Sequence, residues 1–160
     1  MKRLYVILVY LVPSICLSAE ITTGTCNDAD ACIYLKGEIK GPDSNKFSEI
    51  ARTLNRGTVA VHLESPGGYP VAAEEIGQAI HKHSWSTVAD SACNSACSLI
   101  WLAGNKKASI ASNGQCVFHA PFRITNPGRI SDPHLNVIQY LYKAGYSKSY
   151  VQTLTMEENR

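Results

Sequence analysis

Three short segments of the chain carry residue types that together could perform nucleophilic catalysis. Ser95 lies in a run of small residues at positions 93–97 (Cys-Asn-Ser-Ala-Cys). Gly67 and Gly68 follow a Ser-Pro pair, and His119 ends a short apolar run. A serine hydroxyl becomes a nucleophile when a base such as histidine takes its proton, and free backbone N–H groups stabilise the oxyanion that forms. The set therefore predicts a serine hydrolase site with Ser95 as nucleophile and His119 as general base.

Each of these residues also has an ordinary structural explanation. Serine is a common residue before a helix, where its hydroxyl caps free N–H groups, and residues 96–103 form an apolar run that suits a helix. A Pro-Gly-Gly sequence is typical of a turn that needs positive φ angles. His119 could be a buried core histidine. At the level of sequence these alternatives stay open, and the order and spacing of the three segments favour catalysis.

The first 19 residues have the pattern of a secretory signal peptide. A basic Lys-Arg pair follows Met1, and residues 4–17 form an apolar stretch that is short for a membrane span and contains a proline. The small residues Ser18 and Ala19 suit cleavage after either of them, and an uncleaved membrane anchor is the alternative. We therefore expect a signal peptide over residues 1–19, a folded domain over the remainder to residue 160, and a periplasmic or secreted protein.

Charge and size restrict the classes of partner. Two of the 15 basic residues belong to the expected signal peptide, and the remaining 13 balance 13 acidic residues. A domain with a net charge near zero gives no reason to expect nucleic acid or an anionic membrane as partner. The mature chain of about 140 residues is large enough for one hydrophobic core. We expect no cofactor.

The cysteine content fits export into an oxidising compartment. Five cysteines remain after residue 19, and Cys26 and Cys32 flank a short polar loop that a disulfide could close. One further pair among Cys93, Cys97 and Cys116 would leave one free thiol. The spacing does not say which of these pairs forms.

Zinc binding is the rival interpretation of the second cysteine group. Cys93, Cys97, Cys116 and His119 together supply the ligand types that zinc prefers. Apolar residues crowd this group, and no second close cysteine pair completes a zinc ribbon. We therefore expect no metal site.

Strand-like and helix-like segments alternate along the chain. Segments rich in β-branched residues predict strands, and apolar residues spaced three and four apart predict amphipathic helices. The expected strands cover residues 31–39, 58–63, 86–89, 109–111 and 116–118; the expected helices cover residues 47–54, 72–83, 96–103 and 135–142, with a last one from Ser147; residues 120–133 are expected to form a polar loop. This alternation favours a single α/β domain with a mainly parallel sheet, in which the loops after the strands meet at one edge.

The three candidate segments resemble those of the superfamily that contains the Clp protease proteolytic subunit and the crotonases. Residues 65–68 (Ser-Pro-Gly-Gly) resemble its oxyanion turn, and Ser95 with Ala96 resembles its nucleophile turn. Residues 118–121 (Phe-His-Ala-Pro) resemble the segment that carries its catalytic histidine. The resemblance covers most of the chain, and it is strongest to small exported members that carry Cys-x-Ser-Ala-Cys around the serine.

This resemblance implies both a fold and a set of roles. The fold would be a spiral of β-β-α units. Ser95 would be the nucleophile and His119 the base, while Gly68 and Ala96 would give backbone N–H groups to the oxyanion. The missing side chain of Gly68 would let the substrate approach the backbone. Many relatives assemble into rings, so a homo-oligomer is implied as well.

The resemblance is incomplete at the third catalytic residue. The superfamily's acid follows the long helix after the histidine, and the matching residues 151–155 contain no carboxylate. Asp132 in the preceding loop is a candidate acid, and a backbone carbonyl or Asn136 could orient His119 instead. Loss of the orienting carboxylate costs a serine triad about 10⁴ in kcat, which leaves room for a slow enzyme or an inactive copy.

Three functional hypotheses follow. The first is ATP-independent hydrolysis of a peptide, amide or small ester, because an exported protein has no ATP supply. The second is an inactive periplasmic binding or assembly module of the same fold, since a fold does not determine a function. The third is a crotonase-type acyl-CoA enzyme, which export disfavours because it removes the protein from cytosolic CoA. None of the three needs a membrane span after signal cleavage.

Overall fold

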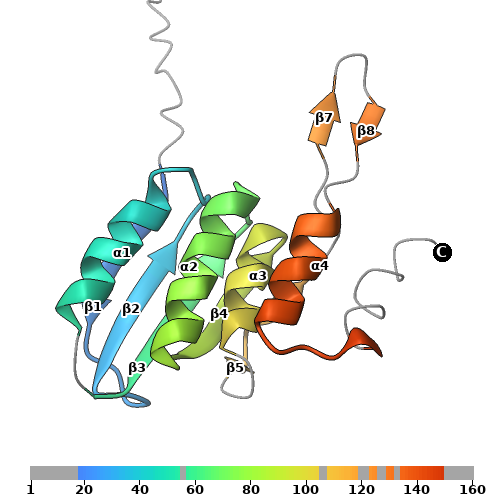
Figure 1. Ribbon diagram of the computed structural model, residues 1–160. Coiled ribbons are helices and arrows are strands. Elements are labelled where there is room, and N and C mark those ends of the chain that lie inside the picture. Colours follow the sequence, from blue (N-terminus) through green and yellow to red (C-terminus); the bar gives the residue numbers. More distant parts are fainter. Residues whose placement is uncertain are drawn as a thin grey trace, which may run out of the picture.

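A mainly parallel sheet forms the centre of the molecule, and helices cover one of its faces (Figure 1). The computed structural model describes residues 18–54, 57–104, 108–118, 123–125, 129–131 and 134–149. The strands of the main sheet are β1 (Glu20–Gly24), β2 (Ala31–Lys36), β3 (Val59–Ser65), β4 (Ser86–Asn94), β5 (Ala108–Ile110) and β6 (Gln115–Val117). The helices are α1 (Asp43–Thr53), α2 (Pro70–His83), α3 (Ala96–Ala103) and α4 (His134–Lys143). The prediction of a mixed α/β fold with a mostly parallel sheet is confirmed.

Strand β4 pairs with three other strands of the sheet. β1 and β2 form an antiparallel hairpin, β2 and β3 are parallel, and β4 is parallel to β3, β5 and β6. Parallel neighbours need a crossover connection, and helices α1 and α2 provide it on either side of β3. The carboxyl ends of β3 and β4 therefore lie at the same edge of the sheet.

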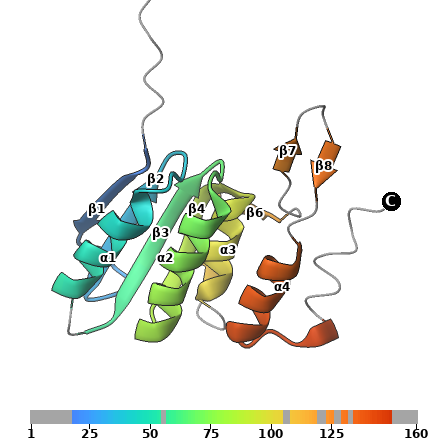
Figure 2. The ribbon, with the colours of Figure 1, turned by 45° about the horizontal axis from the view of Figure 1, so that its top comes forward.

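Alternation along the strands gives the sheet a helix-covered face and a helix-free face. Ile33, Leu35, Val61 and Leu63 are fully buried in the main core with helix residues such as Phe47. The residues between them point to the opposite face. In Figure 2, α1, α2 and α3 all lie on the same side of β2, β3 and β4. The opposite side, which carries Cys32, Tyr34, Ala60 and His62, is the helix-free face.

The structure differs from the sequence prediction in three places. β1 was not predicted, and β4 continues through Asn94 instead of ending at residue 89. Strands β7 (Arg123–Thr125) and β8 (Arg129–Ser131) form an antiparallel pair within the segment expected to be a polar loop. That prediction was wrong because strands of three residues depend on pairing with a partner strand more than on their own composition.

None of the helices within the described ranges is long and apolar enough to cross a bilayer. The expected apolar stretch over residues 4–17 lies outside the described residues, as does most of the last expected helix.

Candidate active site

Ser95 occupies a sharp turn between strand β4 and helix α3. Its backbone has φ 53° and ψ −123°, and residues with a side chain rarely adopt so positive a φ. Strained strand-to-helix turns of this kind expose the nucleophilic serine in α/β-hydrolases. Ser95 precedes the first residue of α3, but its side chain makes no capping hydrogen bond. Helix capping therefore does not explain a serine at this position.

Contacts on both sides hold this turn in its strained conformation. The Ser95 N–H donates to the Val117 carbonyl of β6 at 2.9 Å. The Ser95 carbonyl accepts from the Ser98 N–H at 2.9 Å and from the Ser98 hydroxyl at 2.5 Å. A disulfide between Cys93 and Cys97 spans the serine. A backbone strain of about 1–3 kcal/mol persists only where the surrounding structure enforces it, as these contacts do here.

Gly67 brings the turn after β3 directly against Ser95. A Cβ atom at Gly67 would lie 2.7 Å from the Ser95 Cβ and 2.7 Å from the Asn94 carbonyl oxygen. Gly67 also has φ +104°, a conformation that disfavours side chains. No residue other than glycine fits here without a shift of the backbone. The turns after β3 and β4 therefore meet at one edge of the sheet.

Gly68 is a glycine for a different reason from the one expected. A Cβ atom there would lie 2.1 Å from the Ile39 carbonyl oxygen, so the missing side chain makes room for a neighbouring segment and not for a substrate. The Ile39 N–H donates to the Gly67 carbonyl, and the Tyr69 N–H donates to the Ile39 carbonyl, each at 2.8 Å. These two hydrogen bonds fix the turn, and the Gly68 N–H takes part in neither of them.

Two backbone N–H groups near Ser95 are available to bind an anion. The Gly68 N–H has no acceptor among the residues that the structure describes. The N–H of Ala96, the first residue of α3, has no acceptor within its own helix. These are the two groups that the sequence predicted as oxyanion donors.

The other two predicted site residues, His119 and Asp132, lie outside the described residues. The preceding strand β6 ends at Val117, which pairs in register with Asn94. The chain therefore leaves the sheet beside Ser95, two residues before His119. The side-chain oxygen Oδ1 of Asn94 is buried and has no hydrogen-bond partner within the described part of the chain.

Cys116 is the one described cysteine outside a disulfide. It pairs in register with Cys93, which is bonded to Cys97. Burial raises the pKa of the Cys116 thiol to about 11, so this thiol is protonated at neutral pH. Two of the four ligands in the rival zinc interpretation, Cys93 and Cys97, are joined in a disulfide and therefore cannot bind zinc as thiolates.

A hydrogen-bonded histidine–carboxylate pair lies elsewhere, on the helix-free face. The Nδ1 atom of His62 lies 2.8 Å and 3.0 Å from the two carboxylate oxygens of Asp90. Asp90 and Ser95 lie five residues apart on the chain, and the register of β3 and β4 is irregular between them. The other ring nitrogen of His62, Nε2, lies 3.4 Å from the Asp28 carboxylate, so the pair is directed at Asp28 and not at Ser95. Neither residue had a predicted role, because their pairing depends on the register of β3 and β4.

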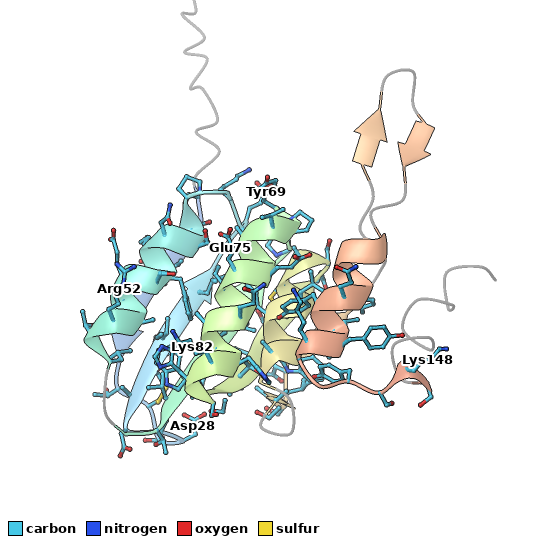
Figure 3. All side chains as sticks on the ribbon, viewed as in Figure 1. Asp28, Arg52, Tyr69, Glu75, Lys82 and Lys148 are labelled. Atoms are coloured by element: carbon cyan, nitrogen blue, oxygen red, sulfur yellow. A yellow bond between two sulfur atoms is a disulfide. The ribbon has the colours of Figure 1, made fainter. Side chains whose placement is uncertain are left out.

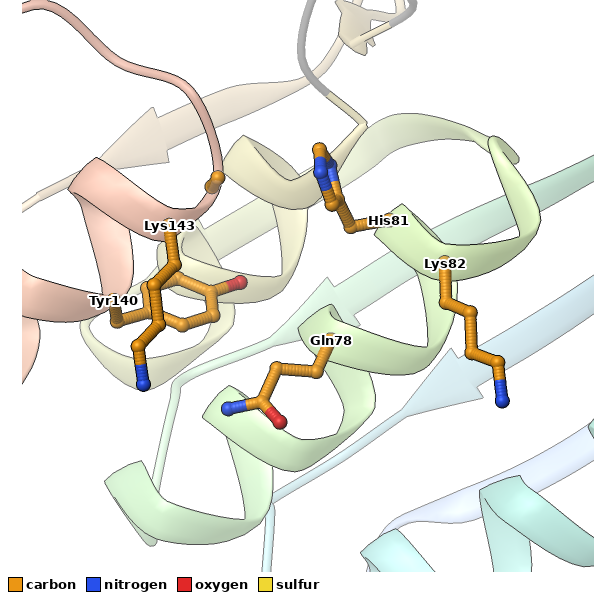
Figure 4. Close-up of a pocket in the computed structure, with 6 residues that line it drawn as sticks. Gln78, His81, Lys82, Tyr140 and Lys143 are labelled. Atoms are coloured by element: carbon orange, nitrogen blue, oxygen red, sulfur yellow. The ribbon is translucent and has the colours of Figure 1, made fainter.

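Two adjoining hollows lie between helices α2 and α4, and Figure 4 shows the first of them. Their volumes are about 120 Å³ and about 170 Å³, whereas ligand pockets usually have about 300–1,000 Å³. The first is lined by Gln78, His81, Lys82, Tyr140, Lys143 and Ala144. The α2 residues among them lie in the second half of that helix, whereas the Gly67 turn precedes its first residue. The hollows are not part of the Ser95 site.

Comparisons with known proteins bear on the fold. No family model and no curated protein sequence matches the chain. Among solved structures, the chain is similar to a ClpP1 mutant from Listeria monocytogenes, with a TM-score of 0.58 and 18% sequence identity over 76% of this chain and 77% of that one. At this identity the similarity concerns the fold alone. The predicted resemblance is confirmed to this extent: the chain has a Clp protease-like fold.

Proposed function

We propose that the protein is an exported serine hydrolase that cleaves a peptide, amide or ester bond, with Ser95 as nucleophile and His119 as general base. The observation that carries the proposal is the strained, uncapped Ser95 turn against Gly67. The Ser95 hydroxyl neither caps its helix nor bonds to any described residue. A serine held at positive φ without a structural role of its own supports a catalytic role, because proteins retain such strain mainly at functional sites.

The proposed mechanism proceeds through an acyl-enzyme. The Ser95 Oγ attacks the substrate carbonyl carbon while His119 takes the hydroxyl proton, and the N–H groups of Gly68 and Ala96 donate to the oxyanion. The bond to the leaving nitrogen or oxygen then breaks, and His119 gives its proton to that group. A water molecule, deprotonated by the same histidine, then attacks the acyl carbon, the bond to Ser95 Oγ breaks, and the histidine returns the proton to Oγ as the acid leaves. These steps need no ATP and no cofactor.

Asn94 is a candidate for the group that orients His119. Its buried, unpaired Oδ1 lies in the residue next to Ser95, and an amide oxygen can accept the Nδ1–H of a histidine. Cysteine proteases of the papain type use an asparagine in this way. Asp132 and Asn136 remain the candidates from the sequence. A neutral amide compensates the imidazolium charge less than a carboxylate does, so we expect slow turnover.

An inactive binding or assembly module is the second candidate function. Tyr69 and Val71 follow the Gly68 turn directly, and their side chains are 51% and 48% exposed. Exposed apolar side chains beside the turn would suit the capture of an extended peptide without its cleavage. This alternative and the hydrolase share the same surface and differ in whether Ser95 reacts.

The proposal includes export, with cleavage after Ser18. Ala19 is only 2% exposed, and its N–H donates to the buried carboxylate of Asp43 at 3.1 Å. The same carboxylate accepts from the Lys40 N–H at 2.7 Å. Cleavage after Ser18 would place the new α-ammonium of Ala19 beside Asp43, whereas cleavage after Ala19 would remove a core residue. The intact mass of the exported protein should identify Ala19 as the first residue, and a chain that begins at Glu20 would contradict this.

A fluorophosphonate probe tests the hydrolase proposal directly. The oxidised, folded protein should be labelled at Ser95, as located by mass spectrometry, and the Ser95→Ala variant should not be labelled. Ser91→Ala is the matched control, because it removes a partly exposed serine hydroxyl from the same strand. If the folded wild-type protein takes up no probe, the binding-module alternative replaces the hydrolase.

A further inference from the structure

Four potential metal ligands lie together where the β1–β2 hairpin meets β3. We call them the hairpin cluster: Cys26, Asp28, Cys32 and His62, whose ligand atoms all lie within 4.8 Å of one another. Figure 3 shows Asp28 at one end of the sheet and Tyr69, which follows the Gly67–Gly68 turn, at the other. The hairpin cluster is therefore separate from the Ser95 turn.

His62 is held in the orientation of a metal ligand. In the neutral imidazole whose Nδ1–H donates to Asp90 at 2.8 Å, the lone pair is on Nε2. The Nε2 atom is buried, lies 3.4 Å from the Asp28 carboxylate, and makes no hydrogen bond with any described residue. The Tyr34 ring stacks on the imidazole with centroids 5.0 Å apart. A histidine fixed by a carboxylate on one nitrogen, with the other nitrogen directed at further ligand atoms, is the usual arrangement of a zinc ligand.

The sulfur atoms of the two cysteines lie close to the Nε2 atom of His62. They are joined in a disulfide, and the Cys32 sulfur lies 3.7 Å from an Asp28 carboxylate oxygen. Zinc favours a tetrahedron of thiolate, imidazole and carboxylate ligands with bonds of about 2.0–2.3 Å, so neighbouring ligand atoms lie about 3.5 Å apart. The widest separation in the hairpin cluster would have to shrink by about 1 Å to meet this geometry.

The loop that carries Asp28 is fastened independently of the disulfide. The Asp30 carboxylate accepts from the Thr58 N–H at 2.7 Å and from the Thr58 hydroxyl at 2.9 Å. A Cβ atom at Gly57 would lie 2.8 Å from the same carboxylate, so the loop rests directly on the start of β3. We therefore expect Asp28 to stay near His62 when the disulfide opens. The Asp28 side chain is 47% exposed, which gives an ion access from solvent.

We propose that the hairpin cluster binds one Zn²⁺ ion when the Cys26–Cys32 disulfide is reduced and releases it when the disulfide forms again. A dithiol reductant supplies two electrons and two protons: the S–S bond breaks, two thiols form, and the reductant becomes a disulfide. Both thiols lose their protons to solvent when their sulfurs bind the ion. A disulfide oxidant takes the two electrons back and leaves His62 and Asp28 alone, which are too few ligands for a structural zinc site.

This proposal does not depend on the proposed hydrolase, and it departs from the sequence analysis. The sequence indicated a plain disulfide at Cys26 and Cys32 and no metal site. The parallel register of β2 and β3 pairs Tyr34 with His62 and places Cys32 one pair away on the same face. The spacing of these residues along the chain does not predict that Cys32 and His62 lie close together.

Titration with Co²⁺ tests the site, because Co²⁺ substitutes for Zn²⁺ in tetrahedral sites and is coloured. The reduced full chain should bind one Co²⁺ with intense visible bands and a thiolate-to-cobalt charge-transfer band, and Zn²⁺ should displace it. The oxidised protein should bind more than about 100-fold more weakly, because it lacks two ligands and even loss of a residue that only orients a ligand costs about 10–100-fold.

Variants separate this site from the other cysteines. His62→Ala and Cys32→Ser should abolish the charge-transfer band, and Asp90→Asn should weaken binding about 10–100-fold with the band shape unchanged, as expected of a positioning residue. Reduction also opens the other disulfide, so Cys93→Ala/Cys97→Ala and Cys116→Ser are the matched controls, which should keep the band. Circular dichroism checks that each reduced variant is folded.

Several results would overturn the proposal. They are equal binding by oxidised and reduced protein, a charge-transfer band that survives in His62→Ala, a band lost in the Cys93→Ala/Cys97→Ala control, and reduced wild-type protein that unfolds without taking up Co²⁺.

Discussion

The Ser95 turn and the hairpin cluster contain the same kinds of parts in different positions of the sheet. Each has a disulfide across a short stretch of chain, and each has a buried polar side-chain atom without a described partner. The Ser95 turn lies past the end of β4, next to the first backbone N–H groups of α3. The hairpin cluster gathers around His62 in the middle of β3, and only side chains supply its potential ligand atoms.

This comparison shows that a histidine–carboxylate pair does not by itself identify a hydrolase. His62 and Asp90 have the hydrogen bond that joins base and acid in a serine triad. The other nitrogen of His62 faces Asp28 and the cysteine sulfurs instead of a serine hydroxyl. Ser95 has the reverse arrangement, a strained turn beside the proposed oxyanion donors and no described histidine next to it. Position within the sheet decides which chemistry each group of residues can perform.

Removing His119 and His62 one at a time is the strongest test of the difference between the two regions. His119→Ala should reduce fluorophosphonate labelling of Ser95 by more than about 10³-fold, since loss of the base alone nearly abolishes catalysis in serine proteases. Labelling rates followed by mass spectrometry measure the effect. His83→Ala removes an exposed histidine that stacks on Trp85 and should label like the wild type. Loss of labelling in His62→Ala, with normal labelling in His119→Ala, would reverse the assignment.

A methyl group at Gly67 tests how closely the two turns meet at Ser95. Gly67→Ala places a Cβ atom 2.7 Å from the Ser95 Cβ at a positive φ, and we expect it to lower the free energy of unfolding by about 3 kcal/mol. Urea unfolding measures the change. Gly41→Ala is the control, because a Cβ atom there would meet only the Tyr69 ring at 3.9 Å. Equal stabilities of the two variants would show that the turns are not in contact.

Removing each disulfide separates stability from reactivity. Both loops are short, so Cys93→Ala/Cys97→Ala and Cys26→Ala/Cys32→Ala should each lower the free energy of unfolding by about 2 kcal/mol. The Cys93–Cys97 bond spans Ser95, and its removal alone should also slow probe labelling of folded protein. Denaturant unfolding and labelling rates check the two parts. A similar slowing in both variants would mean that the distinction between the regions fails.

The smallest expected effect concerns the loop of the hairpin cluster at acid pH. The Thr58 N–H and then the Thr58 hydroxyl lower the pKa of the Asp30 carboxyl from its ordinary value of 3.8. A lowered folded pKa stabilises the protein above the unfolded pKa, and this stability is lost as pH falls through the folded pKa. Wild type should therefore be more stable than Asp30→Asn near neutral pH, with a difference that shrinks below about pH 4 in urea unfolding. A difference independent of pH would show that the carboxylate charge plays no part.

Much of the framework was predictable because it depends on local patterns. Apolar residues three and four apart marked α1 and α2, a continuous apolar run marked α3, and a β-rich run marked β3. The tight turns at Gly67 and Ser95 were visible from small residues at strand ends. β1 and the β7–β8 pair were missed because short strands depend on a partner strand more than on their own composition.

The sequence by itself determined the α/β class, the order of the main elements and the meeting of the Ser95 and Gly67 turns at one edge, because periodicity and the chirality of parallel crossovers leave few other solutions. Only the tertiary structure decided which two of Cys93, Cys97 and Cys116 pair, why Gly68 lacks a side chain, and which residues surround His62. His62 and Asp90 are 28 positions apart and meet through strand register alone. A shift of one residue in that register would turn either side chain to the opposite face of the sheet.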